Sequence, residues 1–176
     1  NRVVALLFKK PSTRTRFSFE VGIFQMGGES ISVSSNELQI SNSETMSDTA
    51  SVLTKYLDMI VLRTENHSDL TDLIKHSNIP VINGLSDQSH PCQVLSDIFT
   101  YEEISGSIED KKVVWLGDAN NVCNSYIQAS DKFNFELTIC GPLEFIPRDN
   151  NVQNFKYEVD PKKALKNADL IVTDTW

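Results

Sequence analysis

Cysteine is scarce in this chain, and the three that occur, Cys92, Cys123 and Cys140, are too scattered for a disulfide framework or a zinc site. Long apolar runs are also missing: none has the length of a transmembrane helix, and no signal segment opens the sequence. The formal net charge of −8 argues against nucleic acid or an anionic membrane surface as a partner. We therefore expect a cytoplasmic protein.

Glycine-rich cofactor motifs are lacking as well. The turn after the apolar run Val113–Leu116 reads Gly117-Asp118-Ala119-Asn120-Asn121-Val122, which does not match the G-x-G-x-x-G dinucleotide fingerprint. No metal-ligand spacing and no nucleophilic Ser or Cys triad is visible in the sequence. We expect neither a metal nor a cofactor.

Short apolar runs alternate with helical patterns along the chain, which predicts an α/β protein built on parallel sheets. The expected strands are Val3–Phe8, Ser30–Ser34, Met59–Arg63, Pro80–Asn83, Val113–Gly117, Leu137–Cys140 and Leu170–Thr173. The expected helices are Thr13–Met26 with an apolar stripe of Phe17, Val21 and Phe24, Thr45–Tyr56, Ser68–His76 with Ser68 as cap and Leu70, Leu73 and Ile74 inward, and Pro91–Ile104.

A change of composition near Ser105-Gly106-Ser107 predicts two lobes, because small residues are followed by a charged stretch and then a new strand. Each lobe is expected to be a parallel sheet flanked by helices, over residues 1–105 and 106–176, with the second lobe incomplete. The chain starts directly in a strand and stops where a strand should pass into a loop, so we expect a fragment.

The most informative segment is Lys9-Lys10-Pro11-Ser12-Thr13-Arg14-Thr15-Arg16, which directly follows the first apolar run. A strand followed by Pro, hydroxyls and alternating arginines indicates a strand-to-helix junction that Ser12 or Thr13 can cap. Unpaired backbone N–H groups and guanidinium groups then favour a dianion such as phosphate.

Three further features fall at the ends of expected strands, where ligands bind in such folds. Arg63 ends one strand and is either a ligand contact or a salt-bridge partner. His90 and Gln93 open a helix, with a capping role for His90 as the alternative. Asn121 and Asp174 suit a polar, partly cationic molecule, and a purely structural role as caps or turn residues is equally open for them.

Together these residues predict a pocket for a phosphorylated carbonyl compound facing a pocket for a cationic molecule. Direct group transfer, with electrostatic stabilisation of a tetrahedral intermediate, is the chemistry that fits them.

The motifs resemble the aspartate/ornithine carbamoyltransferase family, and His90-Pro91-Cys92-Gln93 with Thr173-Asp174-Thr175-Trp176 resembles its ornithine branch. The resemblance implies that the phosphate of carbamoyl phosphate is bound by Ser12, Thr13, Arg14 and Thr15, and that its carbamoyl oxygen is held and polarised by Arg63, His90 and Gln93. It also implies that ornithine is bound by Asn121 and Asp174. Gln39 is implied to reach into the site of a neighbouring subunit.

By the same resemblance, the reaction is carbamoyl transfer from carbamoyl phosphate to the δ-amine of L-ornithine, giving L-citrulline and phosphate, in arginine metabolism or the urea cycle. It implies a carbamoyl-phosphate domain at residues 1–105, a partial ornithine domain at 106–176, and a homotrimer or higher oligomer without a cofactor. A polypeptide that ends at Trp176 stops before the loop that closes over ornithine, so we expect it to be weakly active or inactive.

Three alternatives stay open from the sequence. The first is a sister carbamoyltransferase that acts on putrescine or acetylornithine. The second is a non-catalytic anion-binding module of the same fold. The third is a nucleotide-binding α/β domain.

Overall fold

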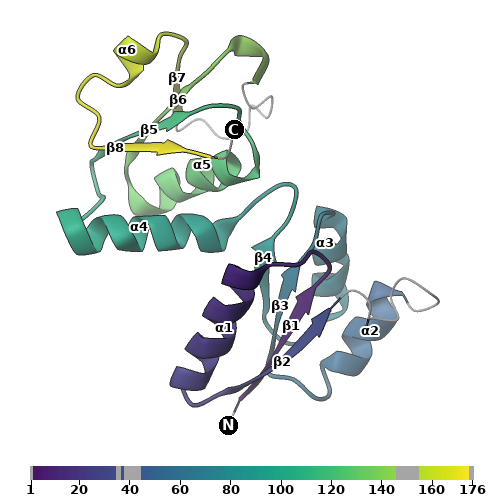
Figure 1. Cartoon of the computed structure of the whole chain (residues 1–176). Helices are drawn as coiled ribbons and strands as arrows, with labels where there is room; N and C mark the ends of the chain where they lie inside the picture. The colour runs from purple at the N-terminus through teal and green to yellow at the C-terminus, as the bar shows by residue number, and fades with distance from the viewer. Residues whose placement is uncertain (1, 35–36, 38–44, 146–154, 175–176) are drawn as a thin grey trace. The chain divides into compact units, whose positions relative to one another are not determined.

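The computed structural model describes residues 2–34, 37, 45–145 and 155–174. It divides into two compact units, Asn1–Asp87 and Gln88–Trp176, and each has a parallel sheet of its own (Figure 1). No helix of the described ranges combines the length and the apolar character needed to cross a membrane.

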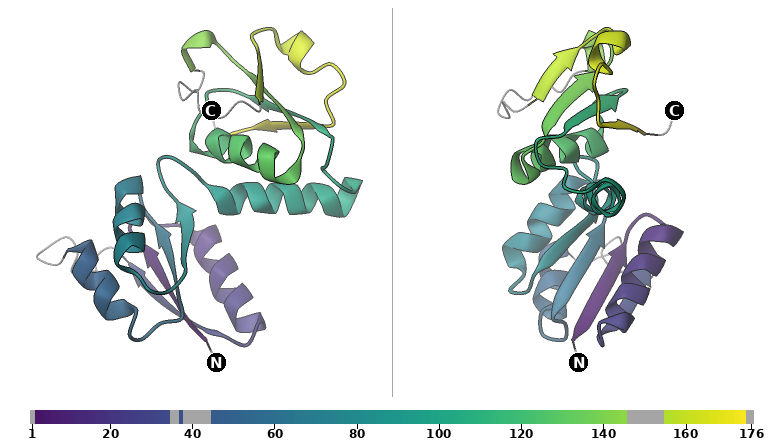
Figure 2. Two further views of the ribbon diagram at one scale, coloured as in Figure 1. Left: turned by 180° about the vertical axis from the view of Figure 1, so that it is seen from behind. Right: turned by 90° about the vertical axis from the view of Figure 1, so that its left-hand side faces the viewer.

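The sheet of the first unit has the strand order β2-β1-β3-β4, with every neighbouring pair parallel. Its elements are β1 (Val3–Phe8), α1 (Thr13–Gln25), β2 (Glu29–Ser34), α2 (Met46–Leu53), β3 (Met59–Arg63), α3 (His67–His76) and β4 (Val81–Leu85). Helix α1 covers one face, where Ile23 packs on Leu6, and α2 and α3 cover the other, where Leu73 and Ala50 pack on Leu7 (Figure 2). The apolar run of β1 is therefore buried on both sides.

The second unit has the strand order β7-β6-β5-β8, again parallel throughout. Its elements are α4 (Pro91–Ser105), β5 (Lys112–Leu116), α5 (Asn121–Phe133), β6 (Glu136–Cys140), the short 3₁₀ helix η2 (Leu143–Phe145), β7 (Phe155–Glu158), α6 (Pro161–Ala164) and β8 (Leu170–Thr173). Helices α4 and α5 share the larger core with Trp115 and Ile139, whereas α6 contributes Ala164 to a smaller cluster with Val114 and Cys140.

The expected fold class is confirmed, and every strand expected from the sequence is present, with ends that shift by a residue or two. Strand β4 runs on to Leu85, past the expected end at Asn83. Strand β7 and helices α5 and α6 complete the sheet of the second unit. Parallel strands need a crossover connection. Helix α5 provides it between β5 and β6, and α6 provides it between β7 and β8.

Three details of the helices were predicted wrongly. Ser68 does not cap α3: the helix starts one residue earlier, at His67, and Asn66 stands before it without a side-chain cap bond. The stripe expected to anchor α1 is exposed, to 60% at Phe17 and 80% at Phe24, because Ile23 occupies the face toward the sheet.

Ile74 was also expected to point inward, and it is half exposed, although Leu70 and Leu73 are buried as expected. The division between the lobes stays a prediction. Compactness groups α4 with the second unit, where it packs on α5, whereas the expected boundary lies after it, between residues 105 and 106.

Candidate functional site

The turn between β1 and α1 is closed by Ser12. Ser12 is the N-cap of α1: its Oγ accepts a hydrogen bond from the Thr15 N–H at 3.4 Å and donates to Thr15 Oγ1 at 2.9 Å. The first backbone bond of the helix runs from the Arg16 N–H to the Ser12 carbonyl at 3.2 Å. The N–H groups of Thr13 and Arg14 precede that bond, so they are donors without an intrahelical acceptor.

Arg63 is carried to this turn by the pairing of β3 with β1, in which it stands opposite Phe8. Its carbonyl accepts from the Lys9 N–H at 2.9 Å, and its Nη1 donates to Thr15 Oγ1 at 3.2 Å. Burial lowers the pKa of the guanidinium, and its buried Nε has no hydrogen-bond partner. A bound anion beside this group would offset the burial of its charge.

Thr15 links the cap to the arginine. Its Oγ1 accepts from both Ser12 Oγ and Arg63 Nη1, which uses both lone pairs of the hydroxyl. The hydrogen of the Thr15 hydroxyl is then the group left to donate. A phosphate oxygen is a suitable acceptor for it.

The cations of this region differ in how they are neutralised. Arg16 Nε pairs with Glu20 at 2.8 Å, and Lys10 pairs with Glu65 at 3.2 Å. Within the described ranges, no carboxylate lies at salt-bridge distance from Arg14 or Arg63. The salt-bridge alternative for Arg63 is therefore wrong within those ranges, where no carboxylate is paired with either guanidinium group.

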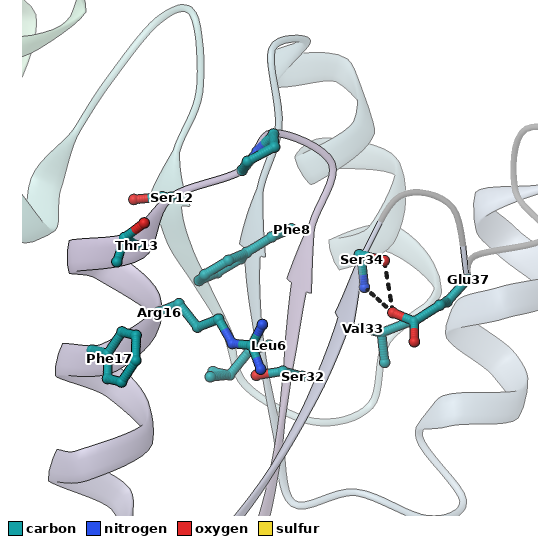
Figure 3. A pocket seen from close by; sticks show the side chains of 11 residues that line it. Leu6, Phe8, Ser12, Thr13, Arg16, Phe17, Ser32, Val33, Ser34 and Glu37 are labelled. Atoms are coloured by element: carbon teal, nitrogen blue, oxygen red, sulfur yellow. Dashed lines mark hydrogen bonds between the residues drawn. The ribbon is translucent and has the colours of Figure 1, made fainter.

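A hollow of about 420 Å³ lies on one side of the same turn. Its lining includes Ser12, Thr13 and Arg16, and Figure 3 shows Arg16 reaching from α1 toward Ser32 of β2. Hydrogen bonds from Ser32 and Arg16 lower the pKa of Glu20, which keeps that carboxylate ionised beside the hollow. Thr15 and Arg63 do not line the hollow. The cation of the turn that lines it is Arg16, which is paired with Glu20.

Asp69 of α3 holds the residues that follow β1 and β3 together. This role was not predicted from the sequence. One of its oxygens, Oδ2, accepts from both Lys9 Nζ at 2.9 Å and Thr64 Oγ1 at 2.6 Å. These donors follow the last residues of β1 and β3, so one carboxylate ties together the two strand ends that carry Ser12 and Arg63. The available signal was an acidic residue in the first turn of a helix, which is common for purely local reasons.

In the second unit, His90 and Gln93 open α4. His90 occupies the N-cap position, but its side chain makes no cap bond, so the capping alternative is wrong. Its backbone N–H donates instead to Oγ of the buried Ser125 at 2.8 Å, which fixes the start of α4 on α5. Gln93, in the first turn, donates from Nε2 to Asp97 Oδ1 at 2.8 Å.

The turn after β5 meets the end of β8, because these strands are neighbours. Asn120 caps α5 by accepting hydrogen bonds from the N–H groups of Val122 and Cys123. Its Nδ2 donates to Asp174 Oδ2 at 2.7 Å. Asn120 thus connects the turn that carries Asn121 to Asp174, which follows the end of β8.

Some expectations cannot be placed. Gln39 lies outside the described residues. Ser12, Thr13, Arg14, Thr15 and Arg63 belong to the first unit, and His90, Gln93, Asn121 and Asp174 belong to the second, so each group stands within its own unit.

None of the thiols is an activated nucleophile. Burial raises the pKa of Cys92 and of Cys140, and it raises that of Cys123, next to the charge of Asp118, to about 12. All three are protonated near neutral pH. In the described ranges, no group of three or more His, Cys, Asp or Glu side chains is arranged to hold a metal ion.

Known proteins match the chain along its whole length. Residues 1–103 match the aspartate/ornithine carbamoyltransferase carbamoyl-P binding domain, and residues 109–176 match the Asp/Orn binding domain of the same family. The ornithine carbamoyltransferase of Ruegeria pomeroyi is 49% identical over all of this chain, which spans 59% of that protein.

Solved structures agree with these matches. The ornithine carbamoyltransferase of Burkholderia thailandensis has a TM-score of 0.93 and 41% identity, over 100% of this chain and 62% of the other. That of Pyrococcus furiosus has a TM-score of 0.93 and 43% identity, over 99% of this chain and 59% of the other.

Proposed function

Because the chain belongs to the aspartate/ornithine carbamoyltransferase family, we propose that the whole protein transfers the carbamoyl group of carbamoyl phosphate to the δ-amine of L-ornithine. The products are L-citrulline and phosphate. The observation that carries the proposal is the hydrogen bond from Arg63 to Thr15, which joins a partly buried cation to a helix N-terminus suited to a phosphate.

The phosphate of the substrate binds at the turn formed by Ser12, Thr13, Arg14 and Thr15. The N–H groups of Thr13 and Arg14, the Thr15 hydroxyl and the Arg14 guanidinium supply donors to its oxygens. Charge-assisted bonds of this kind contribute about 1.5–3 kcal/mol each, enough to hold a dianion in water.

The carbamoyl oxygen accepts hydrogen bonds from Arg63 and His90, which polarise the carbonyl, and Gln93 holds the carbamoyl group. The neutral δ-amine attacks the carbamoyl carbon and forms the new C–N bond. Negative charge then develops on the carbonyl oxygen, and the guanidinium stabilises it. The C–O bond to phosphate breaks with its electron pair, and the proton lost by the amine nitrogen passes to the departing phosphate. No covalent bond to the enzyme is formed.

The second substrate binds through Asn121 and Asp174, whose carboxylate is placed to attract the amine of ornithine. The bond from Asn120 to Asp174 supports this by fixing the carboxylate at the end of β8. The carbamoyl-phosphate domain comprises residues 1–105, and the ornithine domain starts at residue 106.

The wider context is also part of the proposal. The active assembly is a homotrimer or higher oligomer, in which Gln39 completes the site of a neighbouring subunit. The protein works in the cytoplasm, in arginine metabolism or the urea cycle. The three free thiols support a reducing compartment.

Steady-state turnover of the whole protein with ornithine, putrescine and acetylornithine tests the proposal. We expect citrulline and phosphate in equal amounts, with ornithine the best acceptor by kcat/KM. A preference for putrescine or acetylornithine would reassign the second substrate. Carbamoyl-phosphate binding without turnover would leave an anion-binding module, and affinity for NAD or ATP would favour a nucleotide-binding domain.

A further inference from the structure

Asp97 holds two side chains at once, one with each carboxylate oxygen. Gln93 Nε2, one helical turn earlier on α4, donates to Oδ1 at 2.8 Å, and the Tyr126 hydroxyl of α5 donates to Oδ2 at 2.9 Å. Tyr126 is fully buried and packs its ring against Trp115 at a centroid distance of 5.9 Å. Asp97 is thus anchored to the core of the second unit through Tyr126. In an ordinary surface pair of residues four apart on a helix, the acidic side chain has no such second partner.

The direction of these bonds follows from the protonation of the partners. Burial, and then the negative charge of Asp97, raise the pKa of Tyr126 far above its usual range, so its hydroxyl remains a donor. An ionised carboxylate can only accept hydrogen bonds. Only the NH₂ end of the Gln93 amide can therefore face Asp97.

The other end of that amide is a carbonyl oxygen, and it is turned away from Asp97. The Gln93 side chain is exposed at the start of α4, so this oxygen is accessible to a ligand as an acceptor. An acceptor in this position binds an N–H group and gains nothing from a methyl group. A carbamoyl group ends in NH₂, whereas an acetyl group of similar size ends in CH₃.

We propose that Asp97 is a positioning residue that fixes the Gln93 amide with its oxygen toward the substrate, and thereby sets the preference for carbamoyl phosphate over acetyl phosphate. The inference rests on the proposed function, in which Gln93 contacts the carbamoyl group. Loss of one ordered hydrogen bond corresponds to about a ten-fold change in affinity.

Calorimetric titration of the whole protein with carbamoyl phosphate and with acetyl phosphate tests the proposal. The quantity of interest is the dissociation constant of acetyl phosphate divided by that of carbamoyl phosphate. In Asp97→Ala we expect carbamoyl phosphate to bind about ten-fold more weakly while acetyl phosphate is unaffected, so the ratio falls by about ten-fold. A merely structural role would weaken both ligands together and leave the ratio unchanged, which would overturn the inference.

Three variants complete the design. Asp97→Asn is nearly isosteric and offers Gln93 either end of an amide, so it should also lower the ratio if the alanine variant does not fold. Gln93→Ala should lower the ratio as much as Asp97→Ala does, and the double variant should lower it no further, because both changes remove one interaction. Glu103→Gln, at an exposed position of the same helix, should leave the ratio unchanged.

The outcomes separate the inference from the function on which it rests. A wild-type protein that does not bind carbamoyl phosphate would contradict the proposed function and the inference with it. A normal wild-type preference that is lost in Gln93→Ala but retained in both Asp97 variants would overturn the inference alone.

Discussion

Arg63 Nη1 donates a hydrogen bond to Thr15 Oγ1 at 3.2 Å, although 48 residues separate them in sequence. The parallel pairing of β3 with β1 brings the arginine to the turn that opens α1. Since the same hydroxyl oxygen also accepts from Ser12, one side chain connects the helix cap to the partly buried guanidinium of Arg63. The guanidinium that would face the carbamoyl oxygen is therefore hydrogen-bonded to the same turn that would hold the phosphate.

Replacing Thr15 with valine tests this connection. The valine keeps the shape of the side chain but leaves Arg63 Nη1 without its acceptor and removes a donor to the ligand. We expect carbamoyl phosphate to bind about ten-fold more weakly, measured by calorimetry. Thr71→Val, on the exposed surface of α3, is the matched control and should bind normally. Equal affinities in both variants would show that the Thr15 hydroxyl has no part in binding.

Asp69→Asn tests the support beneath the turn. The amide can still accept from Thr64, but it loses the charge that holds Lys9, and both partners of that ion pair are mostly buried. Urea denaturation should show the free energy of unfolding lowered by about 1 kcal/mol. Carbamoyl phosphate should bind several-fold more weakly.

The matched control for Asp69 lies on the same helix. Asp72 pairs with Lys75 at the surface, where the side chains are 53% and 67% exposed, so Asp72→Asn should change the free energy of unfolding by less than about 0.5 kcal/mol. A loss in Asp69→Asn no larger than in this control would contradict the supporting role.

Cys123 predicts a specific dependence of stability on alkaline pH. Its pKa is about 12 in the folded chain, against an ordinary value of 9.0. Between these values the unfolded chain loses the thiol proton and the folded chain keeps it, so the folded state binds more protons and stability falls as pH rises. The stabilisation is fully present below pH 9 and is lost toward pH 12 at up to about 1.4 kcal/mol per pH unit.

Urea denaturation of the wild type and of Cys123→Ala at pH 8, 9.5 and 10.5 isolates this effect. The cavity left by alanine costs the same at every pH, and the other titrating groups cancel in the difference. The free energy of unfolding of the wild type should therefore fall relative to the variant above pH 9. Parallel curves would contradict the raised pKa of the thiol.

The strands and the phosphate turn could be predicted from the sequence because their signals are local. Val3–Phe8 is apolar without interruption, as a strand buried on both faces requires, and Ser12 is a preferred N-cap residue. The prediction that Phe17 and Phe24 face the sheet was wrong for a related reason. Helical spacing reveals an apolar stripe on a helix, but it does not reveal whether that stripe packs on the sheet.

The supporting residues could not be predicted, since their roles depend on partners distant in sequence. Asp69 acts on Lys9, 60 residues away, and Asn120 acts on Asp174, 54 residues away. Asp97 looks like an ordinary surface acid until Tyr126 reaches it from α5. Such contacts become visible only when the sheet topology is known.

Calorimetric titration of carbamoyl phosphate into the wild type and Arg14→Ala tests the central claim most directly, that the turn at residues 12–15 binds the phosphate. Arg14 has no carboxylate partner in the described ranges, whereas Arg16, the matched control, is paired with Glu20. We expect Arg14→Ala to weaken binding by about ten- to a hundred-fold and Arg16→Ala to weaken it far less. Unchanged binding in Arg14→Ala would contradict the account.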